Sequence, residues 1–282
     1  QRVFDDPLEH HPGSADRVYV GLMGLRMYGD LAPWWPLFSA VEDYEEEAAF
    51  AADLLRSAEI EVREVLELGS GGGHNASHLK AHFDMTLVDL SPDMLRVSQA
   101  ANPELEHVVG DMRDVRLGRT FDAVFVHDAV AYMTSREDLS AVFGTAFVHL
   151  RPGGVAVFTP DEVTETFELA TEHGGHDDPT TGRGIRYLEW SWDPDPLDET
   201  VTVEYAVVVR EADGSVSSSH ESHVTGLFPT ATWLDLLSAA ITEQGLKLHY
   251  VLETHAHADH LSGSQLLRRR FGAKVAIVAR IT

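Results

Sequence analysis

Short apolar runs and helix-like segments alternate along the first 160 residues of the chain. The apolar runs have the length and composition of buried strands and span 65–68, 85–88, 107–110, 121–126 and 155–159. Between them, apolar residues recur at helical spacing over 45–57, 75–83 and 137–149, and Ser91-Pro92 reads as the N-cap and first residue of another helix. Strands that alternate with helices predict an α/β fold with a mostly parallel sheet.

The pattern changes on either side of this region. Residues 185–192, 201–210 and 215–226 alternate with a period of two and are separated by turn sequences, which predicts an antiparallel three-stranded insertion. Residues 19–50 carry clustered aromatic side chains interrupted by two prolines, which predicts two helices joined by a turn.

The first strand leads into a glycine-rich turn, V-L-E-L-G-S-G-G-G. Gly69, Gly71 and Gly73 can adopt positive φ and leave room beside the backbone, at the start of the next helix. Asp89 follows the second strand and Asp111 follows the third. The carboxyl ends of parallel strands form the ligand edge of a doubly wound sheet, where an acid about twenty residues beyond the glycine turn suits a ribose diol. The sequence therefore predicts a nucleoside ligand.

Several motifs follow one another along the chain in the order that is typical of a known family. Glu67, Gly69, Gly71 and Gly73 match E/D-x-G-x-G-x-G, and F-D-A-V-F-V and L-R-P-G-G follow at the fourth and fifth strands. The series resembles the class I S-adenosylmethionine-dependent methyltransferases over roughly residues 44–240. The resemblance implies a Rossmann-like, doubly wound fold and methyl transfer from S-adenosylmethionine to a small-molecule nitrogen or oxygen nucleophile.

The resemblance also implies which residues bind the cofactor and act on the acceptor. The cofactor-binding candidates are Glu67, Gly69, Ser70, Gly71, Gly73, Asp89, Leu90, Met94, Asp111, Met112 and His127. His127, Asp128 and Tyr132 follow the fourth strand, where the family places active-site groups. His127 is the candidate base, because an unperturbed imidazole titrates near neutrality. A hydrogen-bonding role for His127 is the alternative.

Two flanking segments resemble a lid and a roof. The N-terminal aromatic segment resembles the helical lid of small-molecule members of the family, and Tyr28 is its candidate beside the methyl group. The insertion at 185–226 resembles the sheet that roofs their acceptor pocket, and its candidates for substrate contact are Tyr187, Trp190, Trp192, His220 and His223. For each of these side chains, ordinary packing is the alternative. His173, His176 and Asp177 are expected to lie in a solvated loop and to bind no metal.

Charge and composition restrict the kinds of molecule that the protein is expected to bind. The formal net charge is −25, from 21 Lys and Arg against 46 Asp and Glu, which disfavours nucleic acid and anionic membranes as partners. No run approaches the length of a membrane span, and the absence of cysteine excludes disulfides and thiolate metal sites. We expect a cytoplasmic enzyme acting on a small-molecule acceptor, with the oligomeric state open and a homo-oligomer among the alternatives.

Two other functions fit part of the pattern. Gly71, Gly73 and Ala76 also match the G-x-G-x-x-A turn of a nicotinamide-dependent dehydrogenase, but that assignment leaves Glu67 and Asp111 without a role. A non-catalytic S-adenosylmethionine-binding protein is the second alternative. Because no residue of the motif series is missing, the sequence favours catalysis over this alternative.

The last segment of the sequence, residues 246–282, departs from the methyltransferase pattern and is called the tail below. Its sequence T-H-A-H-A-D-H-L-S-G resembles the metallo-β-lactamase signature, most closely the persulfide dioxygenase branch, and would offer His255, His257, Asp259 and His260 as metal ligands. That fold takes further ligands from downstream, whereas twenty-two residues follow His260, so a metal would be under-coordinated. We predict a methyltransferase domain over 1–240 and a fragment over 241–282 that binds no metal, with hydrolase or dioxygenase activity as the alternative. Its strand-like runs 247–253 and 274–280 are expected to complete the methyltransferase sheet.

Overall fold

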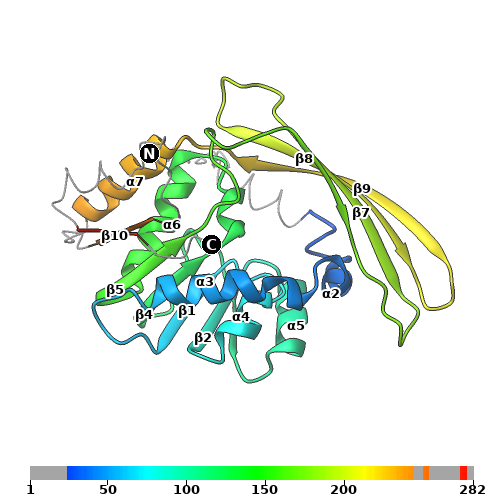
Figure 1. Cartoon of the computed structure of the whole chain (residues 1–282), viewed down its shortest axis with the longest axis horizontal. Coiled ribbons are helices and arrows are strands. Elements are labelled where there is room, and N and C mark those ends of the chain that lie inside the picture. The colour runs from blue at the N-terminus through cyan, green and yellow to red at the C-terminus, as the bar shows by residue number, and fades with distance from the viewer. Residues whose placement is uncertain (1–23, 244–249, 254–273, 278–282) are drawn as a thin grey trace, which may run out of the picture.

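The computed structural model describes residues 24–243, 250–253 and 274–277, and its centre is a five-stranded parallel sheet (Figure 1). The strands are β1 (Glu64–Leu68), β2 (Asp84–Asp89), β3 (Glu106–Val109), β4 (Phe121–Val126) and β5 (Leu150–Phe158). Their order is β3-β2-β1-β4-β5, and every pair is parallel. The order reverses beside β1, so the carboxyl ends of β1, β2 and β4 meet at the switch point where such sheets bind ligands. The predicted doubly wound sheet is confirmed.

Five helices of the described residues flank the parallel sheet. They are α3 (Glu45–Leu55), α4 (His74–Leu79), α5 (Pro92–Ala101), α6 (Arg136–Val148) and α7 (Thr230–Glu243), and three of them, α4, α5 and α6, connect the strands of the sheet. The predicted start of α5 is confirmed, because the Ser91 hydroxyl accepts hydrogen bonds from the backbone N–H groups of Asp93 and Met94. α4 ends four residues earlier than predicted.

An antiparallel sheet lies beside the parallel one and extends away from it as a twisted arm (Figure 1). It contains β6 (Ala170–Gly174), β7 (Gly184–Trp192), β8 (Thr200–Arg210) and β9 (Val216–Gly226), in sequential order. The insertion therefore has four strands, one more than predicted. The extra strand includes His173, which the sequence placed in a loop, because polar side chains with no apolar alternation give a strand no signal.

The N-terminal segment forms short turns where two helices were predicted. It contains η1 (Ala32–Trp34), α2 (Trp35–Phe38) and η2 (Val41–Tyr44) before α3 begins. Prolines early in η1 and α2 supply no N–H for a longer helix. The Phe38 ring stacks on Tyr187 of β7 with centroids 4.1 Å apart, so this segment is packed against the antiparallel sheet.

The two tail strands do not extend the parallel sheet. β10 (Tyr250–Glu253) and β11 (Lys274–Ile277) pair in parallel with each other and form a separate two-stranded sheet. The prediction that they complete the methyltransferase sheet is therefore wrong for the described strands. The four residues of the tail that match the metal-ligand signature, and were predicted to bind no metal, lie outside the described residues.

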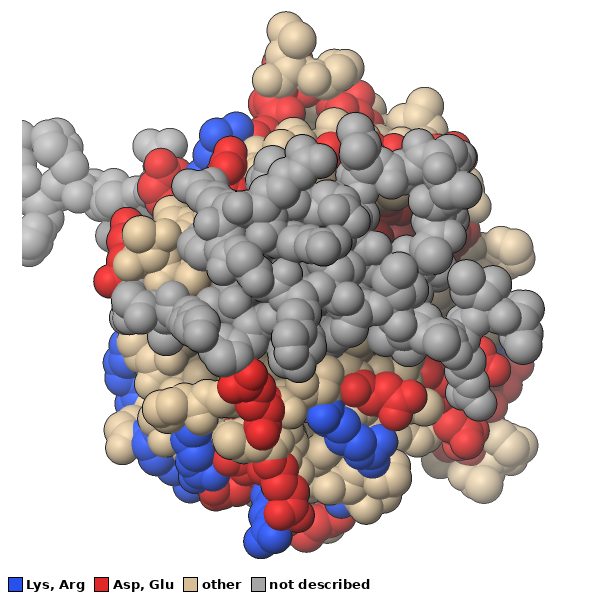
Figure 2. Space-filling model, turned by 60° about the vertical axis from the view of Figure 1, so that its left-hand side comes forward, with Lys and Arg blue, Asp and Glu red and all other residues tan. Residues whose placement is uncertain are grey.

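Acidic side chains are spread over the face of the molecule that Figure 2 shows. Figure 2 shows Asp and Glu across the part of this face that is not grey, with Lys and Arg mainly in its lower half.

Within the described ranges, no helix is long and apolar enough to cross a membrane.

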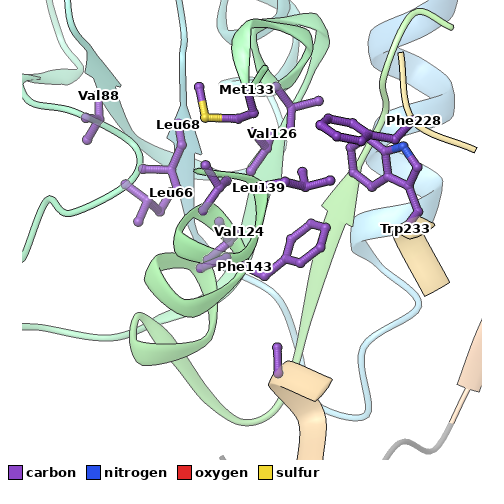
Figure 3. Close-up of a cluster of buried hydrophobic side chains, with 14 of the residues drawn as sticks. Leu66, Leu68, Val88, Val124, Val126, Met133, Leu139, Phe143, Phe228 and Trp233 are labelled. Atoms are coloured by element: carbon purple, nitrogen blue, oxygen red, sulfur yellow. The ribbon is translucent and has the colours of Figure 1, made fainter. Parts of the chain in front are cut away.

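Two apolar cores cover the two faces of the parallel sheet, because successive side chains of a strand point to opposite sides. Val65 packs with α3 and α4 on one face, and its neighbour Leu66 packs with α6 and α7 on the other. In the second core, Phe143 of α6 lies against Trp233 of α7 with ring centroids 5.7 Å apart (Figure 3). Helices on both faces hold the sheet rigid, so its carboxyl edge can fix the position of a ligand.

Candidate functional site

A cavity of about 670 Å³ lies at the carboxyl edge of the parallel sheet. Its walls come from the glycine turn, the N-terminal segment, the antiparallel sheet and η3 (Asp128–Tyr132). The predicted site residues that line it are Tyr28, Glu67, Gly69, Ser70, Gly71, Asp89, Leu90, Met94, Asp111, Met112, His127, Asp128 and Tyr132. Gly73 is the exception, and it serves the packing of the turn.

The glycine turn needs its glycines for conformation and for space. Gly69, Gly71 and Gly73 have φ of 76°, 51° and 73°, a region that side chains with a Cβ rarely adopt. A Cβ at Gly73 would also overlap the Ser98 hydroxyl, and one at Gly72 would overlap the Trp35 ring. Packing therefore closes the turn at Gly73, whereas Gly69, Gly71 and Gly72 line the cavity.

Four buried polar atoms beside the turn have no hydrogen-bond partner among the described residues. They are Glu67 Oε2, Ser70 Oγ, His74 Nδ1 and Asn75 Oδ1, and all four residues line the cavity. Glu67 is only 3% exposed, and burial raises its pKa to about 8 although the nearby His127 opposes the shift. Unpaired buried polar groups are costly unless a ligand satisfies them. This wall fits a polar ligand that brings positive charge to Glu67.

Asp89 is fixed at the end of β2 by two backbone hydrogen bonds. Gly71 N–H donates to Oδ2 and Ser91 N–H donates to Oδ1, each at 2.8 Å. Burial raises the pKa of Asp89, and the two N–H groups oppose that shift. Each oxygen keeps further acceptor capacity, so the carboxylate can receive two hydroxyl groups of a ligand.

Asp111 also lines the cavity, but a neighbouring arginine engages it. Arg113 donates to Asp111 Oδ2 at 2.6 Å and to Asp138 Oδ1 at 3.0 Å. The hydrogen bond to Asp111 is the main reason that the pKa of Arg113 is raised. Arg113 is thus neutralised by two carboxylates, and Asp111 is held rigidly beside Met112.

His127 is enclosed by two carboxylates. Its Nε2 lies 2.8 Å from Glu47 Oε1 and its Nδ1 lies 2.8 Å from Asp128 Oδ1. Burial opposes the charged ring, but these two contacts outweigh it and raise the pKa of His127 to about 10. At neutral pH both ring nitrogens therefore carry protons, and neither is free to act as the predicted base. This geometry favours the hydrogen-bonding alternative.

Asp161 is a cavity residue that the sequence analysis missed. It follows β5 and is hydrogen-bonded to Asp128. Burial, together with the Asp128 charge, raises the pKa of Asp161 to about 8, so Asp161 is mostly protonated at neutral pH. An acid after the fifth strand, at the same sheet edge as Asp89 and Asp111, is the signal that could have found it.

The strand period decides which residues of the antiparallel sheet reach the cavity. Tyr187 lines it, whereas Trp190 and Trp192 do not and stack on each other with centroids 5.9 Å apart. Likewise His223 of β9 lines the cavity, and His220 does not. Tyr187 and Trp190 are three residues apart on one strand and must face opposite sides. Three of the five predicted roof contacts, Trp190, Trp192 and His220, are therefore wrong.

The His173 to Asp177 stretch shows no metal site. Asp177 is paired with Arg186 at 2.6 Å and Arg210 at 2.8 Å, and His176 lies 3.7 Å from Asp43. Within the part of the chain that the structure describes, no group of three or more acidic, histidine or cysteine residues is placed to hold a metal ion.

Comparisons with known proteins agree with this geometry. Residues 65–154 match the family model described as a methyltransferase domain. A Streptomyces venezuelae protein, dTDP-3-amino-3,4,6-trideoxy-alpha-D-glucopyranose N,N-dimethyltransferase, is 31% identical over 215 residues, which cover 74% of this chain and 86% of that protein. The chain belongs to the class I S-adenosylmethionine-dependent methyltransferases.

Solved structures of related methyltransferases share its fold. Streptomyces venezuelae DesVI has a TM-score of 0.64 and 28% identity, with coverage of 82% of this chain and 91% of that chain. CalS10 from Micromonospora echinaspora, an amino pentose methyltransferase solved with S-adenosylmethionine bound, has a TM-score of 0.59 and 25% identity, with coverage of 70% and 82%. The cofactor is S-adenosylmethionine, and the methyltransferase acts on a small molecule. The dehydrogenase and non-catalytic alternatives are disfavoured.

A second family model covers the end of the chain. Residues 226–282 match the metallo-beta-lactamase superfamily. This match agrees with the resemblance of the H-A-H-A-D-H stretch. It overlaps α7, which in this methyltransferase packs against α6.

Proposed function

We propose that this methyltransferase methylates the amine nitrogen of an amino sugar. The proteins named above, a dTDP-amino-sugar N,N-dimethyltransferase and an amino pentose methyltransferase, support an amine on a sugar as the acceptor. The acid content of the acceptor side of the cavity carries the proposal for this chain.

The cofactor would occupy the glycine-turn side of the cavity. Asp89 would receive the ribose hydroxyls, Asp111 and Met112 would lie at the adenine, and the unpaired Glu67 would face the positively charged methionine part. S-adenosylmethionine supplies an electrophilic methyl group on a positively charged sulfur. A cationic ligand suits Glu67, since it stabilises the ionised form of a buried carboxyl.

The acceptor side of the cavity is rich in carboxyl groups. They come from η3, the segment after β5 and the antiparallel sheet, and are Asp128, Asp161, Glu162, Glu168, Glu172 and Glu189. The cations among the described lining residues are Arg113 and the protonated His127, and each is already paired with two carboxylates. Such a wall attracts an ammonium group and repels a carboxylate or phosphate acceptor. It therefore favours an amine as the methylated group.

The chemistry asked of the protein is mainly positioning. In-line attack requires the amine nitrogen to be held against the methyl carbon in a site that excludes water, and the amine must arrive without its extra proton. Aromatic side chains of the N-terminal segment, Tyr28, Trp35 and Phe38, line the cavity and would limit access of water. The charged His127 would hold Asp128 in place toward the acceptor.

A matched acceptor panel tests the proposal. The purified protein is incubated with methyl-labelled S-adenosylmethionine and 3-amino-3-deoxyglucose, its dTDP-linked form, or glucose, and products are identified by mass. We expect one or two methyl groups on nitrogen and none on glucose. Comparing the free sugar with its dTDP-linked form shows whether the acceptor must carry the nucleotide. Label on oxygen, or no label on either amine, would contradict the proposal.

A further inference from the structure

Three side chains, Tyr28, Tyr132 and His223, form a hydrogen-bonded chain that starts at the cavity, and Glu221 lies in ion-pair contact at its end. The Tyr28 hydroxyl lies 2.6 Å from the Tyr132 hydroxyl, which lies 2.6 Å from His223 Nδ1. On the far side of the ring, Nε2 lies 3.3 Å from Glu221 Oε1, an electrostatic contact without hydrogen-bond geometry, so this buried nitrogen has no hydrogen-bond partner among the described residues. The chain crosses three elements, the N-terminal segment, η3 and β9. Tyr28, Tyr132 and His223 line the cavity, whereas Glu221 lies behind them.

The negative charge of Glu221 determines which group donates in each of these hydrogen bonds. Its two oxygens accept the backbone N–H groups of Arg26 at 2.7 Å and Met27 at 3.0 Å. Burial works against ionisation, but the His223 ring and these N–H groups together lower the pKa of Glu221, so it is a carboxylate. A carboxylate beside Nε2 favours the tautomer that carries its proton there, which leaves Nδ1 of His223 as an acceptor.

Both tyrosine hydroxyls must then donate their hydrogen bonds along the chain toward His223. Tyr132 donates to His223 Nδ1, and Tyr28 donates to the Tyr132 oxygen. Burial raises the pKa of both phenols, so neither stores a negative charge at neutral pH. The remaining acceptor site of the Tyr28 oxygen is available to an N–H group in the cavity. Each member of the chain can therefore pass a proton on without becoming an anion.

We propose that Tyr28, Tyr132, His223 and Glu221 form a relay that removes the proton from an ammonium acceptor. This inference rests on the proposed amine methylation. An N–H bond of the ammonium breaks and its proton goes to the Tyr28 oxygen, as the Tyr28 proton moves to Tyr132 and the Tyr132 proton moves to His223 Nδ1. Both tyrosines end neutral, His223 becomes an imidazolium beside Glu221, and the amine keeps the electron pair with which it attacks the methyl carbon.

Two other titratable groups, Tyr205 and Glu189, also face His223. The Tyr205 ring of β8 lies 4.8 Å from the His223 ring, and Glu189 of β7 acts electrostatically on it. Tyr205 is held neutral because burial raises its pKa. Glu221 thus stabilises a charged His223, while burial raises the pKa of Glu189. His223 is 1% exposed, so the proton it takes up is not exchanged directly with bulk water.

The relay predicts one tautomer, which can be measured without any acceptor. In the complex with S-adenosylhomocysteine, ¹⁵N NMR of the histidine rings should show His223 protonated at Nε2 and unprotonated at Nδ1. Glu221→Gln should reduce that preference. A proton on Nδ1 of the neutral ring would make His223 a donor to Tyr132 and would overturn the relay, whatever the acceptor is.

Kinetics with the 3-amino sugars provide the second test. Tyr132→Phe should lower turnover at pH 7 by about 10²-fold, and the loss should shrink toward a pH at which the amine is already neutral. Affinity for S-adenosylhomocysteine by calorimetry should stay within about threefold, which also shows that the variant is folded. His220→Gln is the matched control on β9, since His220 faces away from the cavity, and it should change neither quantity.

A loss that is equal at every pH would assign Tyr132 to packing and contradict the relay. If Tyr132→Phe does not bind S-adenosylhomocysteine, Glu221→Gln carries the same kinetic prediction through His223. If the wild-type protein methylates neither amine, the proposed function fails, and the tautomer still tests the relay independently.

Discussion

Replacing Asp89 with alanine should weaken S-adenosylmethionine binding more than any other single change at the edge of the parallel sheet. The Asp89 carboxylate is held by two 2.8 Å backbone hydrogen bonds, from Gly71 and Ser91, so it meets the ribose without losing conformational freedom. Alanine leaves two ribose hydroxyls buried without acceptors, which costs about 1 to 3 kcal/mol. At 1.4 kcal/mol for each factor of ten, Kd should rise by about 5- to 150-fold.

Isothermal titration with S-adenosylmethionine and S-adenosylhomocysteine measures this directly. Both ligands carry the same ribose, so both should lose affinity equally. Asp84→Ala is the control, because Asp84 lies at the opposite, exposed end of the same strand. Asp89→Ala also removes the acceptors of two N–H groups, so its unfolding should be recorded alongside. An affinity within about twofold of wild type in a folded Asp89→Ala protein would refute the assignment of Asp89 to the ribose.

Three further predictions concern other parts of the chain. The pKa of Glu67 is about 8, above the ordinary 4.5, so the native state binds the extra proton and the free energy of unfolding falls as pH rises through this window. Glu67→Gln should therefore raise the melting temperature of the ligand-free protein by more at pH 9 than at pH 5, and a pH-independent gain would contradict the raised pKa. Asp161→Asn should raise the acceptor KM by about tenfold and leave S-adenosylhomocysteine affinity unchanged, whereas a change in kcat alone would remove Asp161 from acceptor binding. Elemental analysis should find no stoichiometric iron or zinc, and one metal per chain that His257→Ala removes would make the tail a metal site.

The parallel sheet and its cofactor edge could be predicted because local signals and the fold agree there. The glycines have the positive φ that the turn requires, and Ser91 caps the helix as its sequence context indicates. Asp89 and Asp111 reach the cavity because the ends of parallel strands meet at one edge.

The acceptor side was predicted less well, since its residues come together only through tertiary contacts. Glu189 is a single polar residue that no local pattern distinguishes from an exposed one, whereas Asp161 could have been found from its position after the fifth strand. The proton affinity of His127 depends on Glu47, which is eighty residues away in the sequence and beside it in the fold. Trp190 lies three residues from Tyr187 on β7 and so faces away from the cavity, which its aromatic character alone does not reveal.

A single-turnover experiment tests the central claim most directly. The protein is loaded with S-adenosylmethionine labelled with ¹³C at its methyl group, then mixed with one equivalent of dTDP-linked or free 3-amino sugar, and the methyl resonance is followed by NMR. The account predicts that the signal moves from the sulfonium position to an N-methyl position, with up to one methyl transferred per chain. A methyl signal that stays on sulfur with both sugars, or that appears on oxygen, would contradict it.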